Sequence, residues 1–372
     1  MKRILQILGS TNRAGAETMI MNLYREIDRK KYQFDFLVFS DSGGDYNSEI
    51  ESLGGKVHRI KSSNPLKRMF LLKKFLISNN QYQIVHCHTN FSNAFHLLAA
   101  KKAGVKMRIA HSHNTTDKSR NKLISFFYHR ISRRIINYAA TNFVSCGEKA
   151  SNLLFPGQDK VLIIPNSVDI DHHAKVSLEN KNYLTQTFKI SNDCLKLIQV
   201  GRMQSEKNHR FSIEIAYALK HKNINFKMFF VGTGELMNEL ITRVKNLNLE
   251  HHIVFLGLRS DVIQLMAGAD IMLMPSLYEG FPVVLVESQA VGLPALISDT
   301  ISEEVDLKVN CIFFESLQAP INNWIQKITT IQGASRMDNN QRKKILKNQG
   351  FDTKNNANKL IKFYFENDSI NF

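Results

Sequence analysis

The most telling part of the chain reads Ser276-Leu277-Tyr278-Glu279-Gly280-Phe281-Pro282-Val283-Val284-Leu285-Val286-Glu287. It follows an apolar run, which is typical of a buried strand. Pro282 restricts φ to a value near that of a helix and suits the first helical turn. Glu279 is therefore expected in a loop after a strand, and Glu287 about a turn and a half inside the next helix.

The start of that helix is a candidate binding position. The unpaired amides around Phe281, Val283 and Val284 form a positive helix end that suits a phosphate. An acid in the loop and an acid on the helix can reach two parts of one polyhydroxylated ligand. This geometry suits a sugar that is joined to a nucleotide through a diphosphate.

The same order of strand, loop and helix recurs along the chain. Strands are predicted at 3–8, 34–39, 56–60, 84–88, 107–111, 142–145 and 161–164, and again at 195–200, 226–231, 253–256, 271–274 and 295–298. Helices are predicted at 17–29, 66–78, 93–103, 121–138 and 148–154, then at 208–219, 235–247, 262–266 and 283–291. Strands that alternate with helices predict parallel sheets that are covered on both faces.

Two such series in 372 residues predict two doubly wound, Rossmann-like α/β domains that face a cleft. We place the first domain at 1–165 and the second at 166–345. Residues 346–372 are basic and then aromatic, and they are predicted to form a helix that packs back across the domains. The segment Asp169-Ile170-Asp171-His172-His173 is interpreted as a solvated turn in the linker.

The charge is concentrated in the first half of the chain. Of the net charge of +16, residues 1–165 carry +15, from 26 Lys and Arg against 11 Asp and Glu. A basic half can meet nucleic acid, an anionic membrane surface or a phosphorylated substrate.

The four cysteines are scattered without metal-type spacing, and no apolar run reaches the length of a membrane span. A cytoplasmic protein with reduced thiols is expected.

Two cations follow the strand at 195–200, in Gly201-Arg202-Met203-Gln204-Ser205-Glu206-Lys207-Asn208. An Arg side chain can grip phosphate oxygens as a fork, and a Lys supplies a compact charge. Arg202 and Lys207 could therefore neutralise a diphosphate leaving group. Two solvated surface cations are the alternative.

Glycines mark two further loops. Gly232 and Gly234 follow the strand at 226–231, but the third glycine of a dinucleotide fingerprint is missing. An ordinary strand-to-helix turn explains them equally well. Gly15 precedes the first helix, where its amide and those after it could meet a phosphate or an acceptor sugar. A flexible loop is the alternative there.

Histidines stand in pairs at the ends of two strands, His86 with His88 and His111 with His113. Two pairs at the carboxyl ends of parallel strands favour a site over a purely structural role. A metal site is not expected, because no carboxylate or thiol completes a ligand pattern.

Together these segments resemble the retaining glycosyltransferases of family 4, which have the GT-B fold. Segments matching those of the family occur in the family's order: Asn166-Ser167-Val168-Asp169, Gly201-Arg202 with Lys207-Asn208, Gly232-Thr233-Gly234, and Glu279 through Glu287. Within the family, the chain most resembles the enzymes that make bacterial exopolysaccharide and capsule. The segments that carry this resemblance are Arg108-Ile109-Ala110-His111-Ser112-His113-Asn114, Pro275 through Gly280, and Leu293 through Ile301. Two positions depart from the pattern: Ala14-Gly15-Ala16 replaces paired glycines, and Asn166-Ser167 replaces Asn-Gly.

The resemblance implies a role for each matching residue. Arg202 and Lys207 would bind the donor diphosphate, Glu279 the donor sugar and Glu287 the ribose. His113, or else His111, would face the reacting sugar. The implied catalytic residues are Glu279, His113, Arg202 and Lys207, and the implied donor-binding residues are Arg202, Lys207, Gly232, Gly234, Gly280, Phe281, Val283, Val284, Glu287 and Gly15.

The resemblance also implies the reaction. A hexosyl group would pass from a UDP-sugar to a glycan or a polyprenyl-diphosphate-linked saccharide, with retention of configuration and with no metal or other cofactor.

The basic helices at 66–78 and 121–138 carry apolar residues as well. They predict peripheral contact with the inner face of the cell membrane, although helices that cover a sheet also need an apolar face. The alternatives are a nucleotide-sugar epimerase of the same fold, a nucleic-acid-binding protein and a catalytically silent scaffold. Nucleic acid is not expected as a partner, because the common basic-aromatic motifs are missing.

Overall fold

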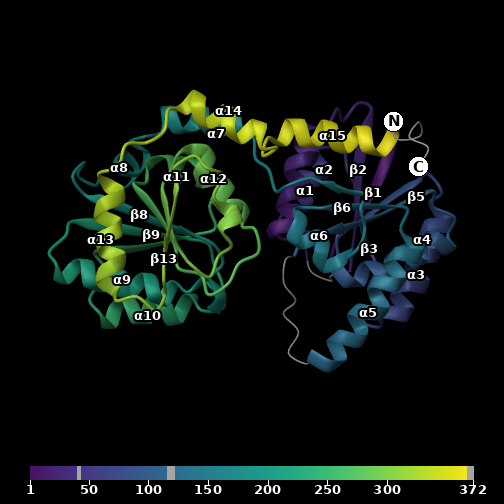
Figure 1. Ribbon diagram of the computed structural model, residues 1–372, viewed down its shortest axis with the longest axis horizontal. Coiled ribbons are helices and arrows are strands. Elements are labelled where there is room, and N and C mark those ends of the chain that lie inside the picture. Colours follow the sequence, from purple (N-terminus) through teal and green to yellow (C-terminus); the bar gives the residue numbers. More distant parts are fainter. Residues whose placement is uncertain (40–42, 115–121, 367–372) are drawn as a thin grey trace. The chain divides into compact units, whose positions relative to one another are not determined.

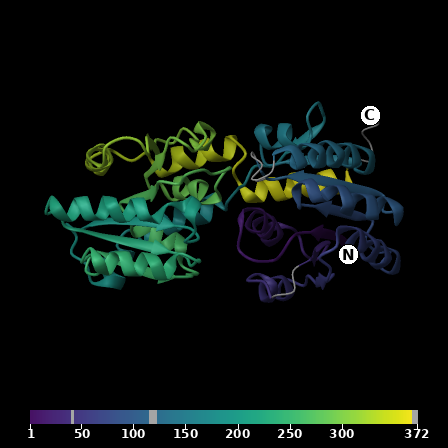
Figure 2. The same ribbon diagram turned by 90° about the horizontal axis from the view of Figure 1, so that it is seen from below.

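The computed structural model describes residues 1–39, 43–114 and 122–366, and residues 122–124 by their backbone alone. The chain divides into two compact units. The first comprises Met1–Ser167 together with Thr353–Phe372, and the second comprises Val168–Asp352. Each unit is an α/β sandwich with its own parallel sheet (Figures 1 and 2).

The first unit is built on a seven-stranded sheet in the order β3-β2-β1-β4-β5-β6-β7. Its strands are β1 (Lys2–Ile7), β2 (Tyr32–Val38), β3 (Val57–Arg59), β4 (Ile84–Cys87), β5 (Met107–Ser112), β6 (Asn142–Ser145) and β7 (Val161–Ile163). Successive side chains of a strand point to opposite faces, so Ile4 lies in one hydrophobic core and Leu5 in the other. Both faces are buried, which explains the nearly continuous apolar runs.

Helices cover both faces of this sheet. One core includes residues of α1 (Gly15–Glu26), α2 (Asn47–Ser52) and α15 (Thr353–Phe365). The other core includes residues of α3 (Pro65–Ser78), α4 (Asn93–Lys102), α5 (Lys122–Ala139) and α6 (Glu148–Leu154), with the short 3₁₀ helix η1 (Asn90–Ser92) beside them. In Figure 1, α15 lies beside α1, and the two helices are in contact.

The second unit is built on a six-stranded sheet in the order β10-β9-β8-β11-β12-β13. Its strands are β8 (Leu195–Val200), β9 (Phe226–Val231), β10 (Ile253–Gly257), β11 (Ile271–Met274), β12 (Ala295–Ser298) and β13 (Ile312–Glu315). Residues of α9 (His209–His221), α10 (Met237–Asn246) and α13 (Ile321–Gln332) form the core on one face. Residues of α7 (Ile170–Glu179), α8 (Tyr183–Phe188), α11 (Val262–Gly268) and α12 (Val283–Val291) form the core on the other. The remaining helices are α14 (Asn339–Asn348) and the 3₁₀ helices η2 (Ser205–Lys207) and η3 (Glu303–Val305).

The structure confirms the predicted class of two Rossmann-like α/β domains. The C-terminal helix α15 belongs to the first unit. The unit boundaries fall after Ser167 and Asp352, whereas the sequence placed them after 165 and 345. Residues 346–352 belong to the second unit because α14 continues through Asn348. Asn121, the first residue of one predicted helix, lies outside the described residues.

Some elements were not predicted, namely α2, α7, α8, β13, α13 and most of α14. The solvated turn expected at 169–173 is wrong. Asp169 caps α7 by accepting a hydrogen bond from the amide of His172, and His173 is buried. Among the described residues, no helix has both the length and the apolar character that crossing a bilayer requires.

Candidate functional site

The loops that carry the predicted donor-binding residues meet at one edge of the second sheet. From β8 the sheet grows in one direction through β9 and in the other through β11, so β8 and β11 flank the topological switch point. Ligands of such sheets bind at the carboxyl ends of the strands at this point. The segment Gly201–Lys207 follows β8, and Pro275–Glu279 follows β11.

Hydrogen bonds join these two loops. The Asn208 side-chain amide donates to the Pro275 carbonyl at 3.0 Å, and the Leu277 amide donates to the Glu206 carbonyl at 2.9 Å. Gln199, a buried polar residue of β8, holds the Lys207 carbonyl at 2.8 Å. These bonds hold the loop that carries Lys207 against the loop that carries Glu279.

Lys207 and Glu279 form an ion pair, with 2.5 Å between Nζ and Oε1. The side chains are only 19% and 12% exposed, so water screens the pair weakly. Sequence reasoning assigned one residue to the diphosphate and the other to the sugar. The structure brings the two together, so each neutralises the other in this state.

Arg202 lies five positions before Lys207 on the same loop. Its side chain is exposed and has no hydrogen bond or ion pair with any residue that the structure describes. An exposed, uncompensated guanidinium beside a switch point can accept an incoming anion.

Gly232 and Gly234 have a structural reason to be glycine. A Cβ on Gly232 would lie 2.2 Å from the Gly201 carbonyl oxygen, and one on Gly234 would lie 2.4 Å from the Met203 carbonyl oxygen. Gly232 also has a φ of +132°, which other residues rarely adopt. These glycines let the loop after β9 pack closely against the loop that carries Arg202. The structure therefore supports the strand-to-helix turn interpretation, and a phosphate contact is not needed to explain them.

The predicted helix at 283–291 is α12, with Pro282 at its N-cap. The Val283 and Val284 amides lie in the first turn, where no carbonyl within the helix is available to them. Glu287 lies four residues after Val283, on the same side of the helix. The Phe281 ring stacks on the Phe351 ring, with 5.7 Å between centroids.

Gly15 is the first residue of α1, at the carboxyl edge of the first sheet. A Cβ built on it would have no neighbour within 4 Å. Its conformation and packing therefore do not require glycine, and they leave room at this helix end.

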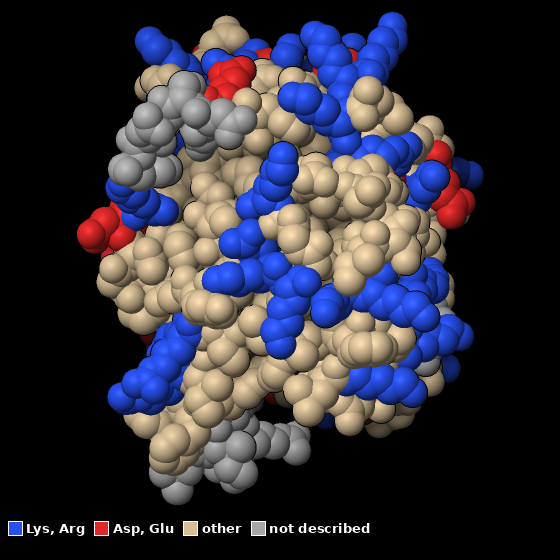
Figure 3. All heavy atoms as spheres, turned by 90° about the vertical axis from the view of Figure 1, so that its right-hand side faces the viewer, with Lys and Arg blue, Asp and Glu red and all other residues tan. Residues whose placement is uncertain are grey.

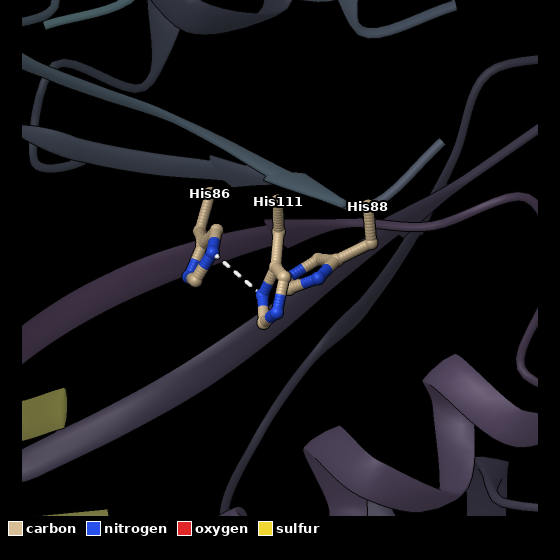
Figure 4. A group of neighbouring side chains, drawn as sticks. All are labelled: His86, His88 and His111. Carbon is tan, nitrogen blue, oxygen red and sulfur yellow. Dashed lines mark hydrogen bonds between the residues drawn. The ribbon is translucent and has the colours of Figure 1, made fainter. Parts of the chain in front are cut away.

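The four predicted histidines come together at the ends of β4 and β5 in the first unit. Figure 4 shows His86, His88 and His111 grouped closely, with a hydrogen bond between His86 and His111. His113 stacks on His111, with 3.9 Å between ring centroids, and hydrogen-bonds to His88 at 2.9 Å. The sequence grouped these residues correctly because neighbouring parallel strands end at one edge of the sheet.

These rings are neutral at pH 7. Burial lowers the pKa of His113 to about 3. Burial, and then the neighbouring rings, hold the pKa values of His86, His88 and His111 well below the usual range. Nitrogen atoms of these three rings lie within 4.8 Å of one another, so among the described residues this group could hold a metal ion. Histidines alone can ligate a metal ion, so the lack of a carboxylate or thiol in the sequence pattern does not exclude a site here.

Sequence reasoning missed two partners of these histidines. Gln6 of β1 and Tyr364 of α15 are buried and hydrogen-bonded to the cluster. Gln6 stands in the otherwise apolar run Ile4-Leu5-Gln6-Ile7-Leu8. A polar residue inside a buried strand needs a partner, which was the available signal.

Comparisons with known proteins agree with this geometry. The family model described as "Glycosyltransferase Family 4" matches residues 13–172, and that described as "Glycosyl transferases group 1" matches residues 183–313. HepE of Anabaena, crystallised with UDP-glucose, superposes with a TM-score of 0.75 over 98% of this chain and 99% of its own, at 18% identity. That likeness shows the fold, which is GT-B.

Sequence relatives extend over most of the chain. A relative from Bacillus subtilis (strain 168), named "Putative glycosyltransferase EpsF", is 38% identical over 98% of this chain and 96% of its own length. The UDP-Gal:alpha-D-GlcNAc-diphosphoundecaprenol alpha-1,3-galactosyltransferase of Escherichia coli is 26% identical over 81% of this chain and 79% of its own. The chain belongs to family 4 of the GT-B glycosyltransferases, among relatives that include enzymes of polysaccharide biosynthesis.

Proposed function

We propose that the protein transfers a hexosyl group from a UDP-sugar to a glycan or a polyprenyl-diphosphate-linked saccharide, with retention of configuration, in the synthesis of a surface polysaccharide such as an exopolysaccharide or capsule. The ion pair of Lys207 and Glu279, on the same loop edge as the exposed Arg202, carries the proposal, because it puts a cation and an acid at the switch point. The name of the Escherichia coli relative includes a UDP-sugar and a diphosphoundecaprenol acceptor, which supports the same substrate classes here.

The donor would replace one ionic partner with another. Its diphosphate would take the place of Glu279 beside Lys207, with Arg202 and the amides of Val283 and Val284 around it. The released Glu279 carboxylate would then accept hydrogen bonds from hydroxyls of the sugar. Glu287, on the same side of α12 as Val283, would hold the ribose hydroxyls.

Charge stabilisation would drive the chemical step. As the bond from the anomeric carbon to the diphosphate breaks, negative charge grows on the leaving phosphate, and preorganised donors stabilise that charge. Arg202, Lys207 and the end of α12 can supply such donors without a metal ion. Full activity after treatment with EDTA is expected, and activity that is lost with EDTA and restored by a divalent ion would contradict this part of the proposal.

The substrate proposal is tested by binding and by product analysis. In calorimetric titrations UDP should bind, and Arg202→Ala should weaken binding roughly ten-fold or more, the size expected for a lost bond to a charged group. Arg210→Ala is a matched control, because Arg210 is an exposed cation of the same unit paired with Glu239. Conversion of the UDP-sugar without any acceptor into an epimer would favour the epimerase alternative instead.

We also propose that the first unit contacts an anionic membrane. Phe126, Phe127 and Ile131 of α5 are 58%, 62% and 56% exposed, so covering the sheet does not explain them. Leu66 and Phe70 of α3 are similarly exposed. Figure 3 shows many Lys and Arg and few Asp and Glu on the side of this unit where α3, α4 and α5 lie in Figure 1.

Not every cation of α3 and α5 is available to a membrane surface. Lys67, Lys74, Arg130 and Arg134 are exposed. Arg133, also on α5, is half-buried and donates to the Leu153 carbonyl at 2.7 Å. Exposed apolar side chains among exposed cations suit the interface of an anionic bilayer, where a lipid-linked acceptor would reside.

A further inference from the structure

Gln6 connects two chains of hydrogen bonds that run through the four buried histidines. Its side chain is fully buried in β1. The Oε1 atom lies 2.8 Å from His88 Nε2, and the Nε2 atom donates to Tyr364 Oη at 3.3 Å. One end of this amide can only accept a hydrogen bond and the other can only donate, so the two chains start with opposite polarity.

The first chain runs from Gln6 Oε1 through His88 to His113. Because Oε1 only accepts, His88 must carry its proton on Nε2 and a lone pair on Nδ1. That lone pair accepts from His113 Nε2 at 2.9 Å, so a neutral His113 keeps a lone pair on Nδ1. His113 Nδ1 is buried and has no hydrogen-bond partner among the described residues.

The second chain runs from Gln6 Nε2 through Tyr364 and His86 to His111. Tyr364 Oη accepts from Gln6, so its own proton goes to His86 Nδ1 at 2.6 Å. His86 then carries its proton on Nε2 and donates to His111 Nδ1 at 3.2 Å. His111 is left with an N–H at Nε2, which is also buried and unpartnered within the described part of the chain.

The two chains of hydrogen bonds therefore end on neighbouring rings, one with an open acceptor and the other with an open donor. His113 offers a lone pair and His111 offers an N–H, and their rings stack with 3.9 Å between centroids. Buried polar atoms are nearly always hydrogen-bonded. Two open atoms of opposite polarity on adjoining rings therefore indicate a bound group that can both donate and accept.

We propose that Gln6 is a positioning residue that holds all four histidines in the Nε2–H tautomer, so that His113 Nδ1 and His111 Nε2 together bind one hydroxyl group. A hydroxyl is the smallest group that donates to one atom and accepts from the other. A saccharide hydroxyl and a water molecule share this chemistry. The choice of a saccharide rests on the proposed function, whereas the tautomers follow from the hydrogen bonds alone.

The tautomers can be read directly in the full-length protein. Histidine labelled with ¹⁵N gives long-range ¹H–¹⁵N correlations that distinguish the protonated ring nitrogen from the bare one. Substitution of each of the four histidines in turn would assign its signals. We expect four Nε2–H rings in the wild-type protein. Four Nδ1–H rings would mean a reversed amide and would overturn the stated polarity, and a mixture would show that Gln6 does not set the tautomers.

Two variants separate the chains. Tyr364→Phe removes only the second chain's link, so His86 and His111 should lose their single tautomer while His88 and His113 keep theirs. Gln6→Glu, read at pH 9, should change His86 and His111 to Nδ1–H, because a carboxylate cannot donate to Tyr364. Equal changes in all four rings, or none, would contradict the proposal. Tyr24→Phe, which removes a buried hydroxyl of the same unit, is the control.

The ligand is tested separately from catalysis. UDP-glucose, UDP-galactose and UDP-N-acetylglucosamine would each be added to the labelled protein, with UDP alone as the control. A saccharide hydroxyl should shift the signals of His111 Nε2 and His113 Nδ1 with at least one UDP-sugar and not with UDP. No shift with any of them would leave water as the bound group and overturn the saccharide assignment.

A stoichiometric metal ion ligated by His86 Nε2 in the purified protein would overturn the tautomer assignment. Failure of sugar transfer in every assay would contradict the proposed function and leave the tautomer result standing.

Discussion

The Lys207 ammonium lies 2.5 Å from a carboxylate oxygen of Glu279, although 72 positions separate the two residues in the sequence. The contact forms because β8 and β11 are neighbours in the sheet and the loops that follow them share an edge. It places a cation and an acid at the switch point of the second unit.

Lys207→Ala should lower kcat roughly 100- to 1,000-fold, which is the usual effect of losing one preorganised donor to a developing negative charge. Lys207→Arg should keep more of the activity, because it keeps the charge. Steady-state kinetics with a UDP-sugar measure both variants. Equal activity of Lys207→Ala and the wild type would exclude a role for this cation in the chemical step.

Glu287→Ala and Glu279→Ala should differ in which kinetic constant changes. Glu287 is proposed to hold the ribose, so its loss should mainly raise KM for the donor, by roughly 10- to 150-fold for a lost charged hydrogen bond. Glu279→Ala should mainly lower kcat, since the carboxylate is proposed to contact the reacting sugar. The same change of KM and kcat in both variants would remove the distinction between their roles.

Gly232→Ala should destabilise the second unit. The added Cβ would meet the Gly201 carbonyl at 2.2 Å, in a backbone conformation with φ of +132°. A cost of about 1–3 kcal/mol is expected from backbone strain and overpacking. Gly15→Ala is the matched control, because its Cβ would meet nothing within 4 Å. Thermal unfolding measures both, and a wild-type midpoint for Gly232→Ala would contradict the loop packing.

The first unit should lose stability as the pH falls from about 6.5. The pKa of His113 is about 3 in the folded protein, and the pKa values of His86, His88 and His111 are also well below the usual range because of burial. The unfolded chain takes up protons near pH 6.5 and the folded chain does not. Each ring then costs roughly 1.4 kcal/mol per pH unit.

Circular dichroism melting curves between pH 7.5 and pH 5 measure this loss. Most carboxylates titrate below this range, so the histidines dominate it. Replacement of the exposed His172 by Gln should leave the slope unchanged. A melting temperature that stays constant down to pH 5 would show that the buried rings accept protons without cost.

Vesicle binding should depend on the exposed aromatic residues of α5. Phe126→Ser with Phe127→Ser should weaken binding to phosphatidylglycerol vesicles at low salt by roughly ten-fold or more, given about 1.5–3 kcal/mol for a fully buried Phe. Leu258→Ser is the control, because Leu258 is 63% exposed in the second unit. Sedimentation measures the bound fraction. Equal binding to neutral phosphatidylcholine would argue against an electrostatic contribution.

Local sequence patterns predicted most of the strands and helices. The sequence by itself determined the alternation of strands and helices, and the predicted bounds of β8, β9, β11 and β12 match the structure. It also determined that Arg202, Lys207 and Glu279 follow strands and that the histidines lie at the carboxyl ends of two strands. These features depend on neighbours along the chain, namely apolar runs, Pro282 and glycine turns. The α13 helix was missed although Trp324, Ile325, Ile328 and Ile331 have helical spacing.

The tertiary structure alone decided the strand order, the pairing of Lys207 with Glu279 and the packing reason for Gly232. It also decided that Gln6 and Tyr364, 358 positions apart, bond to each other and direct the histidines. These contacts join segments that are remote in sequence, and local periodicity does not specify which remote segments pack against each other. A buried polar group must find its partner wherever the fold provides one, so the sequence marked Gln6 as unusual and only the fold showed what it holds.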